Sequence, residues 1–185
     1  MDNIFTRDVH AAFMSRALEL ARQGRGKVSP NPMAGCVLVK DGEIIGEGYH
    51  EKFGGAHAEV SACQNSRQDP IDSTVYVTLE PCCITGKTPP CTDALIHNSI
   101  SEVYIGMLDP NPEINGKGVE ALQNAGISVH VGVMGEEAET LNRPFTKWIT
   151  TGLPWVIAKV AQSADGYMGI DSQESVWLTG QESRG

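Results

Sequence analysis

The chain has 185 residues, of which 41% are hydrophobic, so it can bury one full core but cannot build two domains of ordinary size. Its formal net charge of −9 disfavours DNA and RNA as partners, because a phosphate backbone binds a basic track. No stretch approaches the roughly 20 apolar residues of a membrane span, and the N-terminus lacks the apolar core of a signal peptide. We therefore expect a cytoplasmic protein with a small-molecule ligand and no nucleic-acid or membrane partner.

The N-terminal third is predicted to form a helix, a β-hairpin and a second helix. Apolar residues recur at helical spacing over residues 7–23, before Gly24. Runs rich in Val and Ile at 35–40 and 43–49 flank Asp41-Gly42, a pair typical of a tight hairpin turn. A helix is then expected over about 56–64.

The rest of the chain alternates between strands and helices. Strands are predicted at 74–79, 102–107 and 128–131, and helices at about 91–98, 118–124 and 136–150. Such alternation is typical of an α/β fold with helices on both faces of the sheet. We expect one domain over residues 1–150. A further apolar strand is expected at 155–161, within a segment, 151–185, whose apolar content is too low to fold alone.

Three of the five cysteines, Cys82, Cys83 and Cys91, fall within ten residues of one another. In a reducing compartment such a cluster indicates a metal site or catalysis rather than disulfides. The other two, Cys36 and Cys63, sit in apolar runs and are expected to be buried.

A zinc-deaminase pattern is formed by His57-Ala58-Glu59 at a predicted helix start and Pro81-Cys82 at a strand end. The pattern normally continues as Pro-Cys-x-x-Cys, but position 85 is Thr and the next thiol toward the following helix is Cys91. Cys82 is favoured over Cys83 as a ligand, because adjacent residues of an extended segment point in opposite directions. Cys83 is then expected to lie beside the site without binding the metal.

These residue types suit hydrolysis. Catalytic zinc takes three protein ligands, here His57, Cys82 and Cys91, and leaves one position to water. Glu59, near the metal but not bound to it, can carry the proton of that water to the substrate. We expect one zinc ion per chain.

The motifs His57-Ala58-Glu59, Thr78-Leu79-Glu80-Pro81-Cys82 and Gly86-Lys87-Thr88-Pro89-Pro90-Cys91 closely resemble the deaminase half of the bifunctional deaminase/reductase of riboflavin biosynthesis. The resemblance implies a three-layer α/β/α cytidine-deaminase-like fold with a mixed central sheet, and association into homo-oligomers. It also implies zinc-dependent removal of an amino group from 2,5-diamino-6-ribosylamino-4-pyrimidinone 5′-phosphate, with release of ammonia. The substrate-binding residues that it implies are Asn31, His50, Ala58, Lys87 and Asp109.

One position departs from that family. Most members have Ser-His after the first zinc cysteine, where this chain has Cys83-Ile84. The resemblance implies that the family's histidine contacts the substrate, whereas isoleucine cannot form a hydrogen bond through its side chain. Ile84 is therefore not expected to make the polar contact with the substrate that the family's histidine makes.

Residues 155–161, 163–166 and 175–180 resemble the start of the family's reductase half, which uses NADPH. That resemblance implies that Ala161 and Trp177 contact the cofactor and that Ser175 contacts the substrate. Residues 151–185 would be an incomplete N-terminal segment of the reductase-like domain. NADPH is expected only where a complete reductase is present, and this segment is not expected to transfer hydride.

Two other functions remain open. The chain could be a deaminase of another pyrimidine or nucleobase. It could instead be a binding module in which zinc only stabilises the fold, with Cys83 as a fourth ligand.

Overall fold

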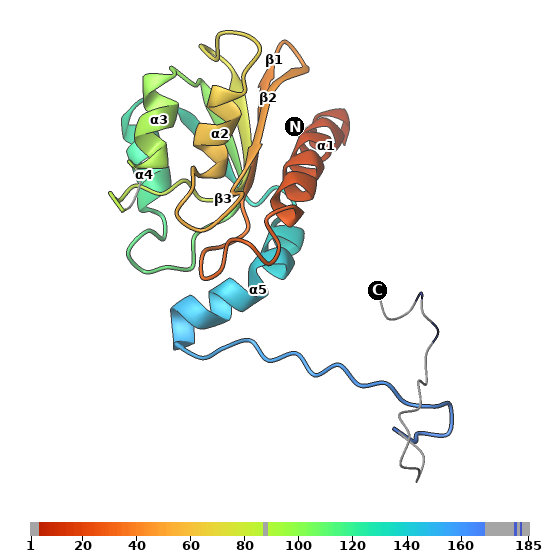
Figure 1. The fold of residues 1–185 in the computed structure, drawn as a ribbon. Helices are drawn as coiled ribbons and strands as arrows, with labels where there is room; N and C mark the ends of the chain where they lie inside the picture. Colours follow the sequence, from red (N-terminus) through yellow and green to blue (C-terminus); the bar gives the residue numbers. More distant parts are fainter. Residues whose placement is uncertain (1–3, 87–88, 169–179, 181, 183–185) are drawn as a thin grey trace. The chain divides into compact units, whose positions relative to one another are not determined.

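A computed structural model describes residues 4–86, 89–168, 180 and 182. In these residues five helices and five strands alternate as the sequence predicts (Figure 1). The strands are β1 (Gly35–Lys40), β2 (Glu43–Tyr49), β3 (Thr74–Leu79), β4 (Glu102–Met107) and β5 (Ser128–Val131). The helices are α1 (Ile4–Arg22), α2 (Ala58–Gln64), α3 (Cys91–His97), α4 (Lys117–Asn124) and α5 (Gly135–Thr151).

The strands form one mixed sheet in the order β2-β1-β3-β4-β5. β1 pairs antiparallel with both β2 and β3, whereas β3-β4 and β4-β5 are parallel. The hairpin turn places Asp41 and Gly42 at φ 52° and 80°, as a turn that matches the strand twist requires. Because β3 and β4 are parallel, the segments that follow them emerge at the same edge of the sheet, the usual place for a ligand site in such folds.

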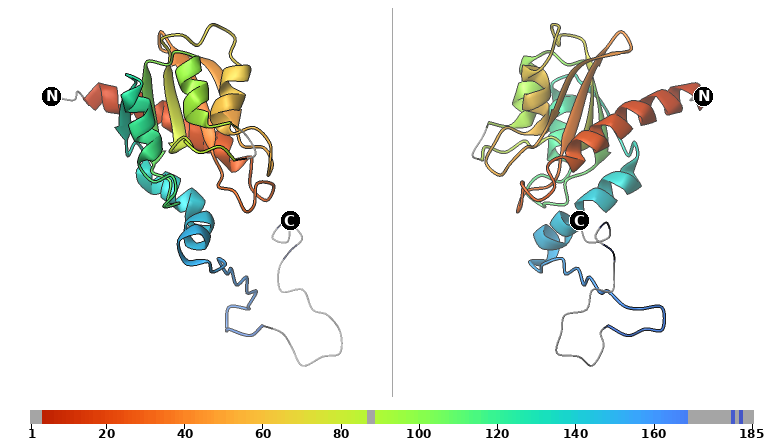
Figure 2. Two further views of the ribbon diagram at one scale, coloured as in Figure 1. Left: turned by 90° about the vertical axis from the view of Figure 1, so that its left-hand side faces the viewer. Right: turned by 45° about the vertical axis from the view of Figure 1, so that its right-hand side comes forward.

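Helices cover both faces of the sheet, as two views show (Figure 2). On one face, buried residues of α2, α3 and α4 such as Ala62, Leu95 and Leu122 pack on the sheet. On the other, α1 and α5 contribute residues such as Leu18 and Leu141. The three-layer α/β/α fold with a mixed central sheet is therefore confirmed.

The five strands have the predicted ends, and the helix ends differ by no more than three residues. The strand expected at 155–161 is wrong: the described residues there form no strand. Val156 and Ile157 are 78% and 79% exposed. A strand needs a neighbouring strand to bond its N–H and C=O groups, and an apolar run supplies no such neighbour by itself.

The chain divides into two compact units, Met1–Pro154 and Trp155–Gly185. In the second, a turn is closed by hydrogen bonds from the Ser163 N–H to the Tyr167 carbonyl (2.8 Å) and from the Gly166 N–H to the Ser163 carbonyl (2.9 Å). Among the described residues, no helix combines the length and apolar character needed to cross a membrane.

Candidate metal and catalytic site

Three side chains with metal-binding atoms meet at the carboxyl edge of β3. His57 immediately precedes α2, Cys82 lies three residues beyond β3, and Cys91 is the first residue of α3. Their ligand atoms all lie within 4.8 Å of one another, and the His57 Nδ1 is 3.2 Å from the Cys91 Sγ and 3.4 Å from the Cys82 Sγ. One imidazole nitrogen and two sulfurs form a donor set of catalytic zinc, so the residues fit the expected ion.

Close backbone packing brings these three residues together. At Gly48 in β2, a Cβ would lie 2.3 Å from the Ala62 nitrogen and 2.5 Å from the Ala58 oxygen. Only glycine therefore lets α2 lie this close to the hairpin. The start of α3 is held by hydrogen bonds from the Cys91 N–H to the Cys82 Sγ (3.4 Å) and from the Thr92 N–H to the Cys82 carbonyl (3.2 Å).

Glu59, in the first turn of α2, is only 4% exposed. Burial, together with the nearby Cys82, raises the pKa of its carboxyl group to about 7. A hydrogen bond from the Cys91 thiol lowers the pKa of Cys82; burial opposes this shift, and a hydrogen bond from His57 adds to it. The pKa of Cys91 is raised, because it shares a proton with Cys82 and is buried. The pair thus holds one thiolate, the form that binds metal, beside a carboxyl group that can exchange protons near neutral pH.

The group opens into a cavity of about 390 Å³. Both polar and apolar side chains line it. The polar lining consists of Asn31, His50, His57, Glu59, Glu80, Cys82, Asp109 and Asn111, and the larger apolar side chains are Phe53, Leu79, Ile84, Ile114, Phe145, Trp148 and Ile149.

Asn31 and His50 form one polar side of the cavity. The His50 Nδ1 lies 2.9 Å from the Ala56 carbonyl, which can only accept, so Nδ1 carries the proton. The Nε2 then accepts from the Asn31 amide at 3.1 Å. Burial lowers the pKa of His50, which favours the neutral ring. This arrangement turns the Asn31 side chain into an oriented hydrogen-bonding group.

Asp109 follows β4 and is 5% exposed. Its backbone N–H donates to the Glu80 Oε2 at 3.0 Å, and its Oδ1 accepts from the Asn111 N–H at 2.8 Å. Burial raises the pKa of Asp109 to about 6. The hydrogen bond from the Asn111 N–H opposes this shift, and the charge of Glu80 adds to it. A carboxyl group that gains or loses a proton at mild pH thus lines the cavity beside Glu80 and Asn111.

The structure places the remaining predicted site residues differently. The Ala58 side chain is fully buried in the core, so any ligand contact would come from its backbone. Ile84 lines the cavity and is 40% exposed, whereas Cys83 is not part of the three-residue metal group. Lys87, Ser175 and Trp177 lie outside the described residues, and Ala161 is exposed in the second unit.

Several cavity residues were missed from the sequence. The sequence motifs indicate no separate role for Glu80, and they predict no ligand contact for Phe145, Trp148 or Ile149. The last three recur at helical spacing on α5, and the only signal this gives is that of an ordinary core face.

Comparisons with known proteins agree with this geometry. Residues 7–107 match the family model described as the cytidine and deoxycytidylate deaminase zinc-binding region. The riboflavin biosynthesis protein RibD of Actinobacillus pleuropneumoniae is 49% identical over 172 residues, covering 93% of this chain and 46% of that protein.

Two solved structures are also similar. RibD of Acinetobacter baumannii gives a TM-score of 0.89 at 45% identity, over 96% of this chain and 50% of that one. A diaminohydroxyphosphoribosylaminopyrimidine deaminase/5-amino-6-(5-phosphoribosylamino)uracil reductase of Thermotoga maritima gives 0.90 at 45% identity, over 95% and 51%. The chain spans about half the length of each of these three relatives.

Proposed function

The chain belongs to the cytidine and deoxycytidylate deaminase family defined by its zinc-binding region, and we propose that it is a zinc-dependent hydrolase of riboflavin biosynthesis. The reaction is deamination of 2,5-diamino-6-ribosylamino-4-pyrimidinone 5′-phosphate, with release of ammonia. Support for the substrate comes from the relatives of Actinobacillus and Thermotoga, which carry riboflavin-biosynthesis and pyrimidine-deaminase names.

The observation that carries the proposal is a buried carboxyl group beside a three-donor metal group. Glu59 is 4% exposed, and it contacts Cys91 through a hydrogen bond. A site that only stabilised the fold would be closed by a fourth protein ligand, and no fourth donor joins His57, Cys82 and Cys91 among the described residues. The burial of Glu59 then serves proton transfer.

His57, Cys82 and Cys91 would hold the zinc ion, which when bound makes water more acidic and so a better nucleophile at neutral pH. Glu59 takes a proton from the attacking water while the water oxygen bonds to the ring carbon that lies between the two ring nitrogens. Glu59 passes that proton to a ring nitrogen, then transfers the second water proton to the departing amine. The carbon–nitrogen bond breaks, ammonia leaves, and the carbon keeps the oxygen as a carbonyl.

Other cavity residues would bind and orient the ring. The Asn31 amide, fixed by His50, and the Asp109 carboxyl group offer hydrogen bonds to the polar edge of a pyrimidine. Lys87, next to the cavity residue Gly86 in the sequence, would pair with an anionic or carbonyl oxygen. Ala58 would contribute through its backbone.

We further propose that residues 151–185 begin a reductase-like domain and that residues 1–150 are the deaminase domain. The Thermotoga relative, whose name includes a reductase, is matched over about half its length. Ala161, Ser175 and Trp177 would contribute to that second site, with NADPH bound only where the reductase is complete. The acidic charge supports a small phosphorylated substrate rather than nucleic acid. We also propose that the protein forms homo-oligomers and is cytoplasmic.

The test is ammonia release by the zinc-loaded protein from a panel of substrates. We expect turnover of the ribosylaminopyrimidine phosphate and not of cytidine, deoxycytidine monophosphate or adenosine. Turnover of one of the last three alone would assign the chain to a different deaminase. No turnover by a folded protein that retains its zinc would leave a zinc-stabilised binding module as the better account.

A further inference from the structure

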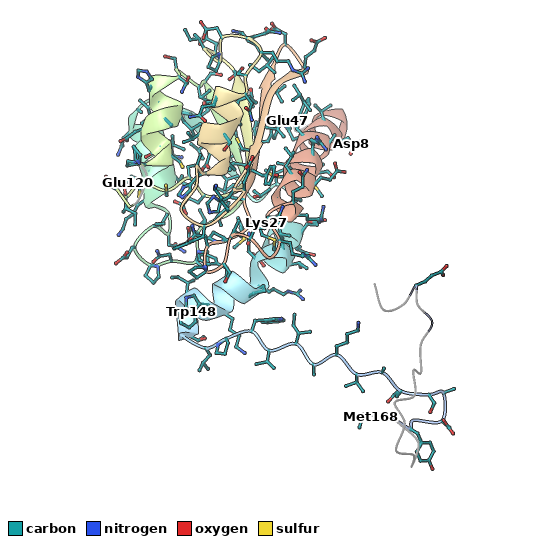
Figure 3. The ribbon with its side chains drawn as sticks, in the orientation of Figure 1. Asp8, Lys27, Glu47, Glu120, Trp148 and Met168 are labelled. Atoms are coloured by element: carbon teal, nitrogen blue, oxygen red, sulfur yellow. The ribbon has the colours of Figure 1, made fainter. Side chains whose placement is uncertain are left out.

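Helix α5 has two halves with different neighbours. In its first half, Ala138 and Leu141 are buried against the sheet. In its second half, Phe145, Trp148 and Ile149 line the cavity beside the metal group. Their spacing of three and four residues places them on one face of the helix. Figure 3 labels Trp148 near the C-terminal end of α5.

A buried side chain between the two halves fixes α5 against the polar side of the cavity. Asn142, 1% exposed, accepts from the Met33 N–H at 2.9 Å and donates to the Met33 carbonyl at 2.9 Å. Met33 follows Asn31 in the same loop. The two bonds therefore hold the second half of α5 at a set position relative to Asn31 and its partner His50.

The exposure of Trp148 indicates that part of this helix face is not packed against other described residues. Its side chain is 49% exposed although it lines a cavity, whereas Phe145 and Ile149 are half-buried. A ligand ring that entered the cavity could pack its flat face on the indole and present its polar edge to Asn31 and Asp109. Aromatic side chains bind the faces of bases in this way with little regard to the edge pattern.

We infer that Phe145, Trp148 and Ile149 form a ring-binding wall that holds the face of the substrate's pyrimidine ring. This inference rests on the proposed function, for which it names the residues that bind the ring face. The wall lies outside residues 7–107, the part that matches the deaminase family model. Its side chains carry no group that exchanges protons near neutral pH, so we assign the wall to ligand binding and selection rather than to the chemical step.

The kinetic test compares Trp148→Ala and Trp148→Phe with the parent. Loss of the ring surface should raise KM for the ribosylaminopyrimidine phosphate about tenfold and leave kcat within about threefold. Phenylalanine should restore most of the affinity. Arg143→Ala is the matched control, because Arg143 is an exposed residue of the same helix outside the cavity lining, and it should behave as the parent does.

A binding test does not depend on turnover. In a Trp155→Phe, Trp177→Phe background, Trp148 is the remaining tryptophan, and the zinc-loaded Glu59→Gln form should bind the same compound without converting it. Saturable quenching of Trp148 fluorescence is expected.

The outcomes separate the two proposals. Ammonia release by the parent with KM unchanged in Trp148→Ala would overturn the wall and leave the proposed reaction standing. No ammonia release, but saturable quenching by the same compound, would overturn the reaction and support the wall. Neither turnover nor quenching by a folded, zinc-loaded protein would overturn both.

Discussion

The Glu80 carboxylate and the backbone of Asp109 are joined by a 3.0 Å hydrogen bond between segments that follow neighbouring parallel strands. The same carboxylate accepts from the N–H groups of Gly116, Gly118 and Val119 at 2.9–3.2 Å. Glu80 is 2% exposed. It thus caps the start of α4 and fixes the Asp109 loop to the segment that carries Cys82.

Replacement of Glu80 by glutamine should destabilise this junction. An amide group would turn an N–H toward backbone donors and leave some of them unpaired, at a cost of about 2–4 kcal/mol in the free energy of unfolding. Urea unfolding of the zinc-loaded protein measures this, with the exposed Glu113→Gln as control. A change below about 0.5 kcal/mol would show that the four bonds do not hold the loop.

The zinc content of variants should show that Cys82 binds the metal and that the adjacent Cys83 does not. Cys82→Ser and Cys91→Ser each remove a sulfur ligand and are expected to lower bound zinc well below one ion per chain after dialysis. Cys83→Ser should keep one ion, because Cys83 is outside the metal group. Metal analysis of the purified variants is the measurement, and loss of zinc from Cys83→Ser would mean that the ligand assignment is wrong.

Stability should depend on pH through Asp109. Its pKa is raised from 3.8 to about 6 in the folded protein, so its contribution to the free energy of unfolding is full below about pH 4 and falls as the pH rises through 6. Asp109→Asn cannot ionise and should be more stable than the parent above pH 6, by on the order of 1–3 kcal/mol.

Urea unfolding at pH 4, 5, 6 and 7 would follow that difference, with the exposed Asp8→Asn as a control expected to parallel the parent. A constant difference between Asp109→Asn and the parent from pH 4 to pH 7 would contradict a raised pKa.

The sequence predicted the strands to the residue because runs such as 74–79 are rich in β-branched residues and are bounded by turns. The strand prediction failed at 155–161. The residues there are mostly apolar, but a strand forms only where a neighbouring strand pairs with it. Helix ends were less well defined, since α1 begins at Ile4 rather than at residue 7. Local pattern therefore predicted the elements, and tertiary pairing decided which of them form.

The candidate metal group could be predicted because its residues belong to compact motifs with distinctive spacing. Glu80 and Trp148 could not be assigned in the same way. The role of Glu80 depends on four backbone donors that come from residues 109–119. The place of Trp148 depends on the bonds between Asn142 and Met33, which are 109 residues apart. Neither relationship leaves a pattern in a single local segment.

The central claim is that Glu59 carries protons at a site formed by His57, Cys82 and Cys91. The most direct measurement is ammonia release by zinc-loaded parent, Glu59→Gln and the exposed Glu51→Gln control, with zinc content and unfolding recorded for each. The account predicts that Glu59→Gln keeps zinc and fold but loses at least about 100-fold in kcat, while Glu51→Gln matches the parent. Near-parental turnover by Glu59→Gln would contradict it.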